Sequence, residues 1–410
     1  MQVSQKVKKY NSIFTPLRDL LNDSRTTGVL LIGCTIISIT ITNSSDSGWL
    51  SHFWNTQWQT ATFPGLNLPS SPISWINNFG MSFFFVLAAT EIKRELLSGE
   101  LSSFKKAVLP FGAAFGGMLV PALIFTAFNL NSGYSHGWGI PTATDIAFSL
   151  AAGSLLGKRF PVGLKILLMA IAIIDDLGAI IVIAVFYGGQ IHWLFLLASA
   201  IIYGVLLACN RFKLKFGSIQ IILGICLWYA MLQAGIEASI TGVLFAFAMP
   251  IKALAGIEKA IHKYVNFLIL PLFALANTAI LLPSHILESI NTPVGMGIIF
   301  GLVIGKPLGI YLACRILVGT KIAHLPSNVK WKQVFGMGTL AGIGFTMSIF
   351  TTMLAFSETS LRDIAKISIL TGVVVSVVLS YLYFRLIAVK AINPMITQSE
   401  TQPEVQLNLS

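Results

Sequence analysis

Apolar residues gather in long runs that short polar segments separate. A run of about 20 predominantly apolar residues is long enough to cross the hydrocarbon core of a bilayer as a helix. Twelve such runs are found, near residues 26–42, 73–92, 107–128, 141–156, 163–186, 191–209, 217–234, 237–250, 264–282, 295–318, 334–356 and 364–388. The fourth and the eighth are short for a full crossing, so we expect interrupted or tilted elements there. The pattern predicts an all-α polytopic membrane protein with about 12 transmembrane helices.

The same pattern divides the chain into three regions. Residues 26–388 form the predicted twelve-span domain. Residues 1–25 are expected to be a cytoplasmic N-terminal segment, in which Phe14, Leu17, Leu20 and Leu21 belong to a short amphipathic helix on the membrane surface. Residues 389–410 are a predicted cytoplasmic polar tail.

Composition and charge agree with insertion into a membrane. Of the 410 residues, 55% are hydrophobic and only 10% are charged, and the mean hydropathy is +0.79. Soluble globular domains carry about 25% charged residues. The 27 Lys and Arg exceed the 16 Asp and Glu, for a net charge of +11, and they gather in alternate loops, with Arg362 the clear exception. We interpret this excess as topology: both termini are placed in the cytoplasm, membrane lipid is the expected surrounding, and nucleic acid is not an expected partner.

The four cysteines carry no sign of a covalent or metal site. Cys34, Cys209, Cys226 and Cys314 lie in or at the ends of apolar runs, without C-x-x-C spacing or a nearby histidine. Neither a disulfide framework nor a zinc site is predicted, and no cofactor is expected.

The fifth run carries two adjacent carboxylates, Asp175 and Asp176, near its middle. An acidic residue at the centre of a spanning helix costs about 3 kcal/mol on insertion scales, which makes such residues functional candidates. Successive helical residues point about 100° apart, so we expect one carboxylate to face a watery cavity and the other a charged neighbour. The alternative is a structural role, in which backbone or hydroxyl donors satisfy the buried acids.

Two further spans hold ionisable residues. Asp145, in the fourth span, follows Thr144 and comes shortly after Pro141, which is suited to opening the helix. Lys306, in the tenth span, stands at mid-depth directly before Pro307. Snorkelling to an interface is the alternative for this lysine, but from mid-span it lacks the reach, so an ion pair with an acid is favoured.

Glycines mark the eleventh span. Two Gly-x-Gly pairs, at 336–338 and 342–344, indicate either close helix packing or an unwound segment where helix ends meet a cation. The fourth and eleventh spans lie in the middle of two three-span groups that start on opposite sides of the membrane. We therefore predict inverted three-helix repeats whose two interrupted helices cross at the midplane, a transporter design. Asp145 suits the paired N-termini of such a crossing, and Lys306 suits the paired C-termini.

Taken together, these motifs resemble those of the NhaA-type Na+/H+ antiporter family. The likeness covers nearly the whole chain and rests on segments 91–96 (EIKREL), 143–148 (ATDIAF), 174–179 (IDDLGA), 270–274 (LPLFA), 305–309 (GKPLG) and 342–347 (GIGFTM). A tandem acid in the fifth span together with Gly-Lys-Pro in the tenth is a specific combination, whereas any one motif alone is a weak signal.

The resemblance implies a secondary antiporter and not an enzyme. It implies electrogenic exchange of cytoplasmic Na+ or Li+ for external H+, in pH and sodium homeostasis, across a bacterial inner membrane. It implies Asp176 as the ion carboxylate and Asp175 as the partner of Lys306, with the two aspartates as the Na+ or Li+ ligands. Asp145 and Thr144 then neutralise and line the helix crossing. A homodimer is the assembly considered.

The resemblance also implies a pH-response cluster at the cytoplasmic mouth. Its members map onto Glu91, Arg94, Glu95, Lys252, Glu258 and His262. Lys259 follows Glu258 where the family often has a histidine, which departs from the pattern. The alternatives are ordinary solvated loop charge and competition between protons and sodium at the aspartates themselves, and we favour competition as the larger effect.

Two other functions are weighed against this reading. A proton-coupled symporter of a small solute stays open on the residues alone. An intramembrane aspartic protease also buries acids, but its two carboxyl groups converge from different helices, whereas tandem acids on one helix diverge. The protease is therefore disfavoured.

Overall fold

The computed structural model describes residues 24–44, 48–58, 68–99, 101–189 and 191–399, and every regular element within them is helical. The elements are α2 (Ser24–Ser44), α3 (Trp49–Asn55), α4 (Pro72–Trp75), η1 (Ile76–Gly80), α5 (Met81–Ser98), α6 (Phe104–Asn129), η2 (Ser135–Thr142), α7 (Ile146–Leu155), η3 (Gly157–Arg159), α8 (Val162–Phe186), α9 (Trp193–Arg211), α10 (Ser218–Ala234), η4 (Ala238–Ile240), α11 (Thr241–Ala248), α12 (Ile251–Tyr264), η5 (Val265–Ile269), α13 (Leu270–Asn277), α14 (Ile286–Ile290), α15 (Pro293–Phe300), η6 (Gly301–Gly305), α16 (Lys306–Gly319), α17 (Trp331–Ala341), α18 (Phe345–Ala355) and α19 (Thr359–Ser399). The amphipathic helix expected within residues 1–25 lies almost wholly outside the described residues.

The helices match the apolar runs of the sequence. Among the described residues, eight helices are long and apolar enough to cross a membrane, or nine if the bent pair α17 and α18 is one span. The other predicted spans, the fourth, seventh and eighth, coincide with shorter apolar helices at Ile146–Leu155, Ser218–Ala234 and Ala238–Ala248. The chain is therefore an all-helical, multi-pass membrane protein, while the count of twelve spans and the inverted repeats stay predictions.

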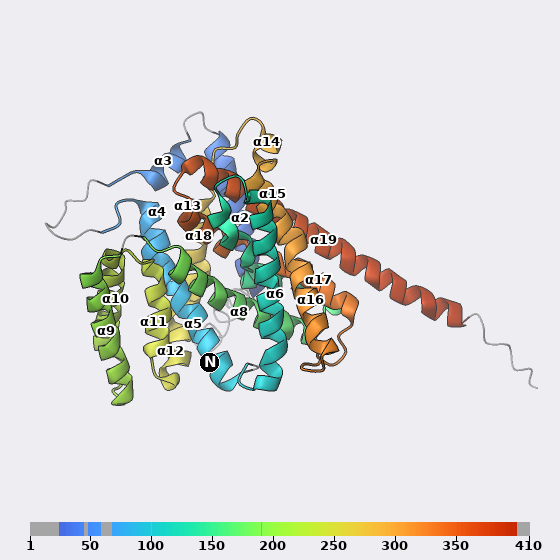
Figure 1. The fold of residues 1–410 in the computed structure, drawn as a ribbon, viewed down its shortest axis with the longest axis horizontal. Coiled ribbons are helices and arrows are strands. Elements are labelled where there is room, and N and C mark those ends of the chain that lie inside the picture. Colours follow the sequence, from blue (N-terminus) through green and yellow to red (C-terminus); the bar gives the residue numbers. More distant parts are fainter. Residues whose placement is uncertain (1–23, 45–47, 59–67, 100, 190, 400–410) are drawn as a thin grey trace, which may run out of the picture.

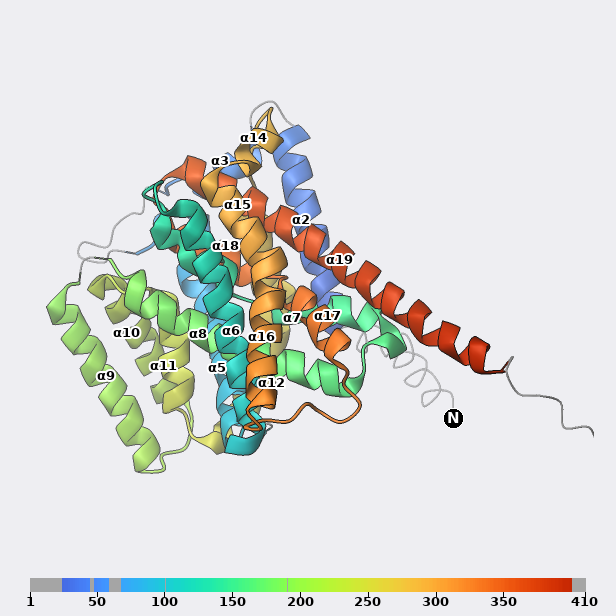
Figure 2. The same ribbon diagram turned by 45° about the vertical axis from the view of Figure 1, so that its right-hand side comes forward.

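The helices gather in two groups. In Figure 1, α9 to α12 lie at the left of the molecule and α6 lies with α15 and α16 to their right; in Figure 2, α9 and α10 stay at the left edge while α6 and α16 lie in the middle. α5 packs on α11 and α12 of the first group, α8 packs on α6 of the second, and α5 and α8 contact each other. Because α8 carries the aspartate pair, the pair lies where the two groups meet.

The fourth and eleventh spans, predicted to be the two interrupted helices that cross, are both broken in the structure, and the eighth, expected to be interrupted or tilted, is the short helical segment of η4 and α11. η2 ends at Thr142, no helix covers residues 143–145, and α7 begins at Ile146. α17 and α18 are separated by residues 342–344 and bent by 48°. The two breaks face each other: the Asp145 amide donates to the Ile343 carbonyl at 2.7 Å. A Cβ at Gly344 would lie 2.7 Å from the Ala143 carbonyl oxygen, so this close approach requires glycine.

Two long helices widen into a π-turn just before a proline. η5 ends at Ile269, two positions before Pro271, and η6 ends at Gly305, two positions before Pro307. Proline gives no amide hydrogen to the carbonyl one turn back and its ring crowds that carbonyl, so a widened turn relieves the helix. α16 also crosses α6 with the backbones in contact, since a Cβ on Gly309 would lie 2.1 Å from the Gly116 carbonyl oxygen. Lys306, at the start of α16, is 0% exposed as a result.

Arg362, the exception to the charge pattern of the loops, has a local partner. Its guanidinium donates to the carbonyl oxygens of Phe356 at 2.5 Å and Met353 at 3.1 Å, at the C-terminal end of α18. A cation there complements the negative end of the helix dipole. Helix capping therefore explains this arginine, and the topology inferred from the other basic residues does not depend on it.

Candidate functional site

Asp145 lies between the N-terminal ends of two helices. Its carboxylate accepts from the Phe148 amide at 2.9 Å, in the first turn of α7, as the N-cap of that helix. It also accepts from the Thr346 amide at 3.2 Å and the Thr346 hydroxyl at 2.7 Å, in the first turn of α18. Helix N-termini carry positive partial charge, which a carboxylate neutralises. The sequence placed Asp145 at paired helix N-termini, and the geometry agrees.

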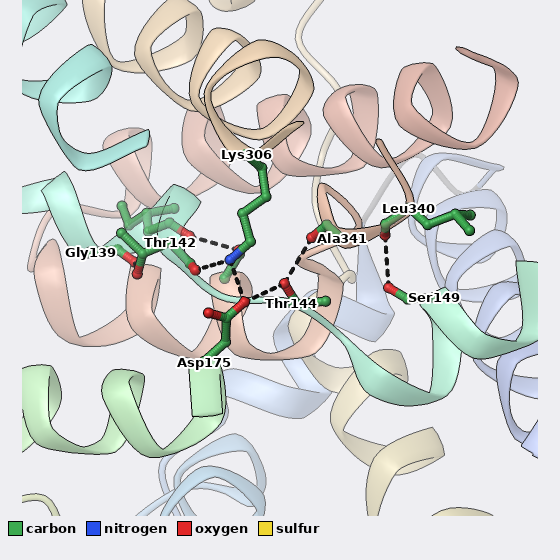
Figure 3. Close-up of polar contacts among 10 residues, drawn as sticks. Gly139, Thr142, Thr144, Ser149, Asp175, Lys306, Leu340 and Ala341 are labelled. Carbon is green, nitrogen blue, oxygen red and sulfur yellow. Dashed lines mark hydrogen bonds and ion pairs between the residues drawn. The ribbon is translucent and has the colours of Figure 1, made fainter. Parts of the chain in front are cut away.

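Lys306 was predicted at paired helix C-termini, and it contacts one such end, that of η2. Figure 3 shows its side chain extending from α16 toward Asp175 and Thr142. The ammonium donates to Asp175 Oδ2 at 2.7 Å and to the Thr142 carbonyl oxygen at the C-terminal end of η2. Both Lys306 and Asp175 are 0% exposed. The expected ion pair therefore exists, and neither of its members reaches solvent.

Thr144 joins Asp175 to the second broken helix. Its hydroxyl oxygen lies 2.7 Å from Asp175 Oδ2 and 2.8 Å from the Ala341 carbonyl oxygen at the end of α17 (Figure 3). The Ser149 hydroxyl donates a hydrogen bond to the neighbouring Leu340 carbonyl oxygen at 2.9 Å. A hydroxyl has one proton, so Thr144 shares its donor between the carboxylate and the helix end. Thr144 therefore connects Asp175 to the end of α17.

Asp176 has different surroundings from its neighbour. It is 4% exposed and lines a cavity of about 120 Å³, together with Thr144, Asp145 and Thr346. Glu91 and His262 line the same cavity. Oδ1 of Asp176 has no hydrogen-bond partner among the described residues. The pair thus diverges as the helical spacing predicts, with Asp175 in an ion pair and Asp176 beside the cavity.

This arrangement has a definite chemical capacity. Asp176 is a buried carboxylate with one unpartnered oxygen, and it lines a cavity together with the oxygen-bearing side chains of Thr144, Asp145 and Thr346. Hard cations prefer oxygen ligands. A buried carboxylate is stable when it is neutralised, either by a cation or by a proton. The site can therefore hold one or the other.

The structure only partly brings together the residues assigned to pH response. Glu91 and His262 line the cavity of Asp176. Arg94 and Glu258 form an ion pair at 2.5 Å, which ties α5 to α12. Lys252 instead lines a separate groove of about 620 Å³ between α5, α10, α11 and α12. Glu95, on α5 with Glu91 and Arg94, does not line the cavity of Asp176.

Two residues of the site, and one on α5 that does not line its cavity, had no role assigned from the sequence. Thr346 binds Asp145 and follows a Gly-x-Gly break, so the start of a new helix was the available signal. Asn266 lines the cavity from the π-turn η5, and its only signal is a polar side chain within an apolar run. Lys93 donates to the Phe247 and Met249 carbonyl oxygens at 2.8 and 2.5 Å, and so caps the end of α11.

Comparison with known proteins places the chain among close relatives. The family model described as Na+/H+ antiporter 1 matches residues 18–384. The chain is 41% identical over 395 residues to Na(+)/H(+) antiporter NhaA 2 of Clostridium beijerinckii, covering 94% of this chain and 98% of that protein. It is 43% identical over 371 residues to Na(+)/H(+) antiporter NhaA of Flavobacterium psychrophilum, covering 89% and 94%. It is 42% identical over 368 residues to the Escherichia coli O6:H1 antiporter of that name, covering 87% and 95%.

Proposed function

The chain belongs to the Na+/H+ antiporter 1 family, and on this basis we propose that it exchanges cytoplasmic Na+ or Li+ for external H+ across a bacterial inner membrane. Both termini are cytoplasmic, and the exchange is electrogenic and serves pH and sodium homeostasis. The basic residues of the loops support this orientation. In this orientation Glu91 and His262 lie on the cytoplasmic side of the cavity, because α5 continues after Glu91 into a loop with basic residues, and such loops are cytoplasmic.

One observation carries the proposal. Asp176 is a nearly fully buried carboxylate that lines a cavity with other oxygen-bearing side chains, and its Oδ1 has no hydrogen-bond partner among the described residues. Asp175, one residue away, is already neutralised by Lys306. A cation that enters the cavity therefore finds its uncompensated negative charge at Asp176. We assign Asp176 as the ion ligand, with Asp175 as its partner and Thr144 and Asp145 lining the site.

Mutual exclusion of sodium and protons gives the exchange cycle. At low cytoplasmic proton activity Asp176 gives up one proton and the Asp175–Lys306 pair gives up another, and the two carboxylates then load Na+. After the two helix groups rock against each other, external protons displace the ion, and the protonated site returns. Since the two aspartates are adjacent, their protons belong to the pair and not to single residues. The contacts of Thr144 with both Asp175 and Ala341 link this charge change to a broken helix.

The experiment is sodium-driven proton flux in proteoliposomes with an internal pH dye. Asp176→Asn keeps the volume and removes the exchangeable charge, so we expect no sodium-driven flux. The matched control is Glu288→Gln, the same loss of charge at an exposed acid on α14, which should exchange like the parent. Full flux from Asp176→Asn refutes the assignment of the ligand.

The same assay separates the antiporter from a symporter of organic solutes. Sodium alone, added without any organic solute, should collapse a proton gradient that is acid inside the vesicles. A flux that appears only when a solute is added would contradict the antiporter proposal and support the symporter.

A further inference from the structure

The phenol of Tyr187 joins the end of α8 to the first half of η2. Its hydroxyl donates to the His136 carbonyl oxygen at 2.7 Å and accepts from the Gly139 amide at 3.2 Å. These two backbone groups are three residues apart, the spacing at which a 3-10 turn pairs its own carbonyl and amide. Tyr187 directly follows α8, and its amide donates to the Ile183 carbonyl oxygen at 3.1 Å. The hydroxyl is therefore fixed to the same helix as Asp175.

A chain of hydrogen bonds continues from Gly139 to Lys306. The Gly139 carbonyl oxygen accepts from the Thr142 hydroxyl at 2.8 Å, and the Thr142 carbonyl oxygen accepts from the Lys306 ammonium (Figure 3). The same ammonium donates to Asp175 at 2.7 Å. The placement of η2 therefore decides whether Lys306 has a second acceptor beside the carboxylate.

η2 is held from two helices between its ends. Ser348 of α18 donates to the Ile140 carbonyl oxygen at 2.7 Å, whereas Tyr187 of α8 holds the preceding turn. Without the phenol, the His136 carbonyl and the Gly139 amide are left to bond to each other, and the turn tightens. The carbonyl oxygen to which the last residue of η2 bonds then moves with this turn. Removing the phenol therefore displaces the inner end of η2.

We propose that Tyr187 is a positioning residue for Lys306. Its phenol holds η2 so that the Thr142 carbonyl oxygen shares the ammonium with Asp175. A hydrogen bond to the charged form of a group stabilises that form, and such bonds are stronger than those between neutral groups. The pair of Asp175 and Lys306 therefore releases its proton less readily, and sodium loading is held back in acid. The inference rests on the proposed exchange for its effect on transport, but its effect on stability is measurable without transport.

The charged groups around Lys306 define the background of this effect. Burial raises the pKa of the Tyr187 phenol to about 12, so the phenol keeps its proton and acts through its hydrogen bonds. The charged side chains that face Lys306 are Asp175 and Asp176, both on α8. Of the elements packed on α16, α6 carries Lys105 and Lys106 in its first turn, α17 carries Lys332, and η6 carries no charged residue; η2 adds His136, whose ring lies against Phe356. A variant that removes the phenol hydroxyl changes none of these charges.

The first test is the pH profile of sodium-driven exchange in proteoliposomes for Tyr187→Phe, which keeps the ring and removes the hydroxyl. Because Lys306 loses its fixed second acceptor, the profile should move toward acid by about one pH unit, the size of one hydrogen bond to a charged group. At a fixed acid pH, the apparent dissociation constant for sodium should fall about tenfold. A lower maximal rate with an unmoved profile, or a move toward alkali, overturns the proposal.

The matched control for this test is Tyr381→Phe. It removes the same hydroxyl from an exposed tyrosine on α19. We expect this variant to keep the parental profile. An equal shift in Tyr381→Phe and Tyr187→Phe also overturns the proposal, since the shift then has nothing to do with η2.

The second test is a double-mutant cycle in thermal unfolding. If the phenol acts through Lys306, Tyr187→Phe should lower the unfolding temperature of the parent more than that of Lys306→Met, in which the ammonium is already absent. A parallel cycle of Tyr187→Phe with Lys332→Met, at an exposed lysine of α17, should be additive. Additive effects in the cycle with Lys306→Met overturn the proposal.

The two tests also keep this inference separate from the proposed function. If the parent shows no sodium-driven flux, the proposed function fails, while the unfolding cycle still decides whether Tyr187 acts through Lys306. If exchange is intact and the cycle is additive, the inference alone fails.

Discussion

Replacing Lys306 by methionine tests the electrostatic account of the site directly. The side chain keeps its length and apolar stem but loses the ammonium that donates to Asp175 at 2.7 Å. The Thr144 hydroxyl is then the one donor left to Oδ2, and Oδ1 already has no hydrogen-bond partner among the described residues. Both partners are 0% exposed, so water does not replace the lost charge. Removing one member of a buried pair costs about 3–5 kcal/mol, chiefly because the other charge is left alone.

The measurement is thermal unfolding in detergent, followed by tryptophan fluorescence, for the parent and a double-mutant cycle. Lys306→Met should unfold at a clearly lower temperature than the parent. Adding Asp175→Asn removes the stranded charge, so the double variant should recover most of the loss. The matched control is Lys332→Met, the same substitution at an exposed lysine in the first turn of α17. If Lys306→Met and Lys332→Met unfold at the same temperature, the pair does not stabilise the core and the reasoning is refuted.

Three further predictions concern exchange and the helix breaks. Because protons and sodium compete at Asp176, the apparent dissociation constant for sodium should rise about tenfold per pH unit below the apparent pKa of the site, about 1.36 kcal/mol per unit. Saturating sodium should then restore the exchange rate at acid pH. An apparent sodium constant that does not vary with pH, together with a maximal rate that collapses in acid, would contradict competition. Gly338→Val should lower both stability and exchange, because a Cβ at Gly338 would lie 2.7 Å from Pro307 Cα, beside Lys306. Thermal unfolding and sodium-driven flux measure the two effects. A variant that matches the parent in both would show that the helices can move apart at this contact without loss. Arg362→Gln should lower stability by about 1–2 kcal/mol, since the end of α18 loses a charged donor; an unchanged unfolding temperature would show that the cap contributes nothing.

The membrane class and the positions of the helices followed from the sequence alone. Apolar runs of spanning length have one physical solution in lipid, the helix, because each backbone group must be satisfied within its own segment. Breaks in the helices were predictable where a residue that disrupts a helix is present in the sequence, such as Pro141 in the fourth span and the glycines of the eleventh. Acids and a lysine at mid-span were also visible as candidates, since their burial has no local explanation.

The partners of those residues were decided by tertiary structure. Helical spacing predicted that Asp175 and Asp176 diverge, but only the packing of α16 against α6 decides that Lys306 meets Asp175. The same holds for Asp145, whose two helix ends come from segments 201 residues apart in the chain.

The residues assigned to pH response show the limit most clearly. Sequence resemblance grouped six charged residues, yet the fold puts Glu91 and His262 at the cavity and Lys252 in another groove. Asn266 lies at the same cavity without any charge or motif to mark it. The pattern of apolar and polar residues predicts which side chains are buried. A cavity, however, is formed by several helices together, and which side chains line it depends on how those helices cross.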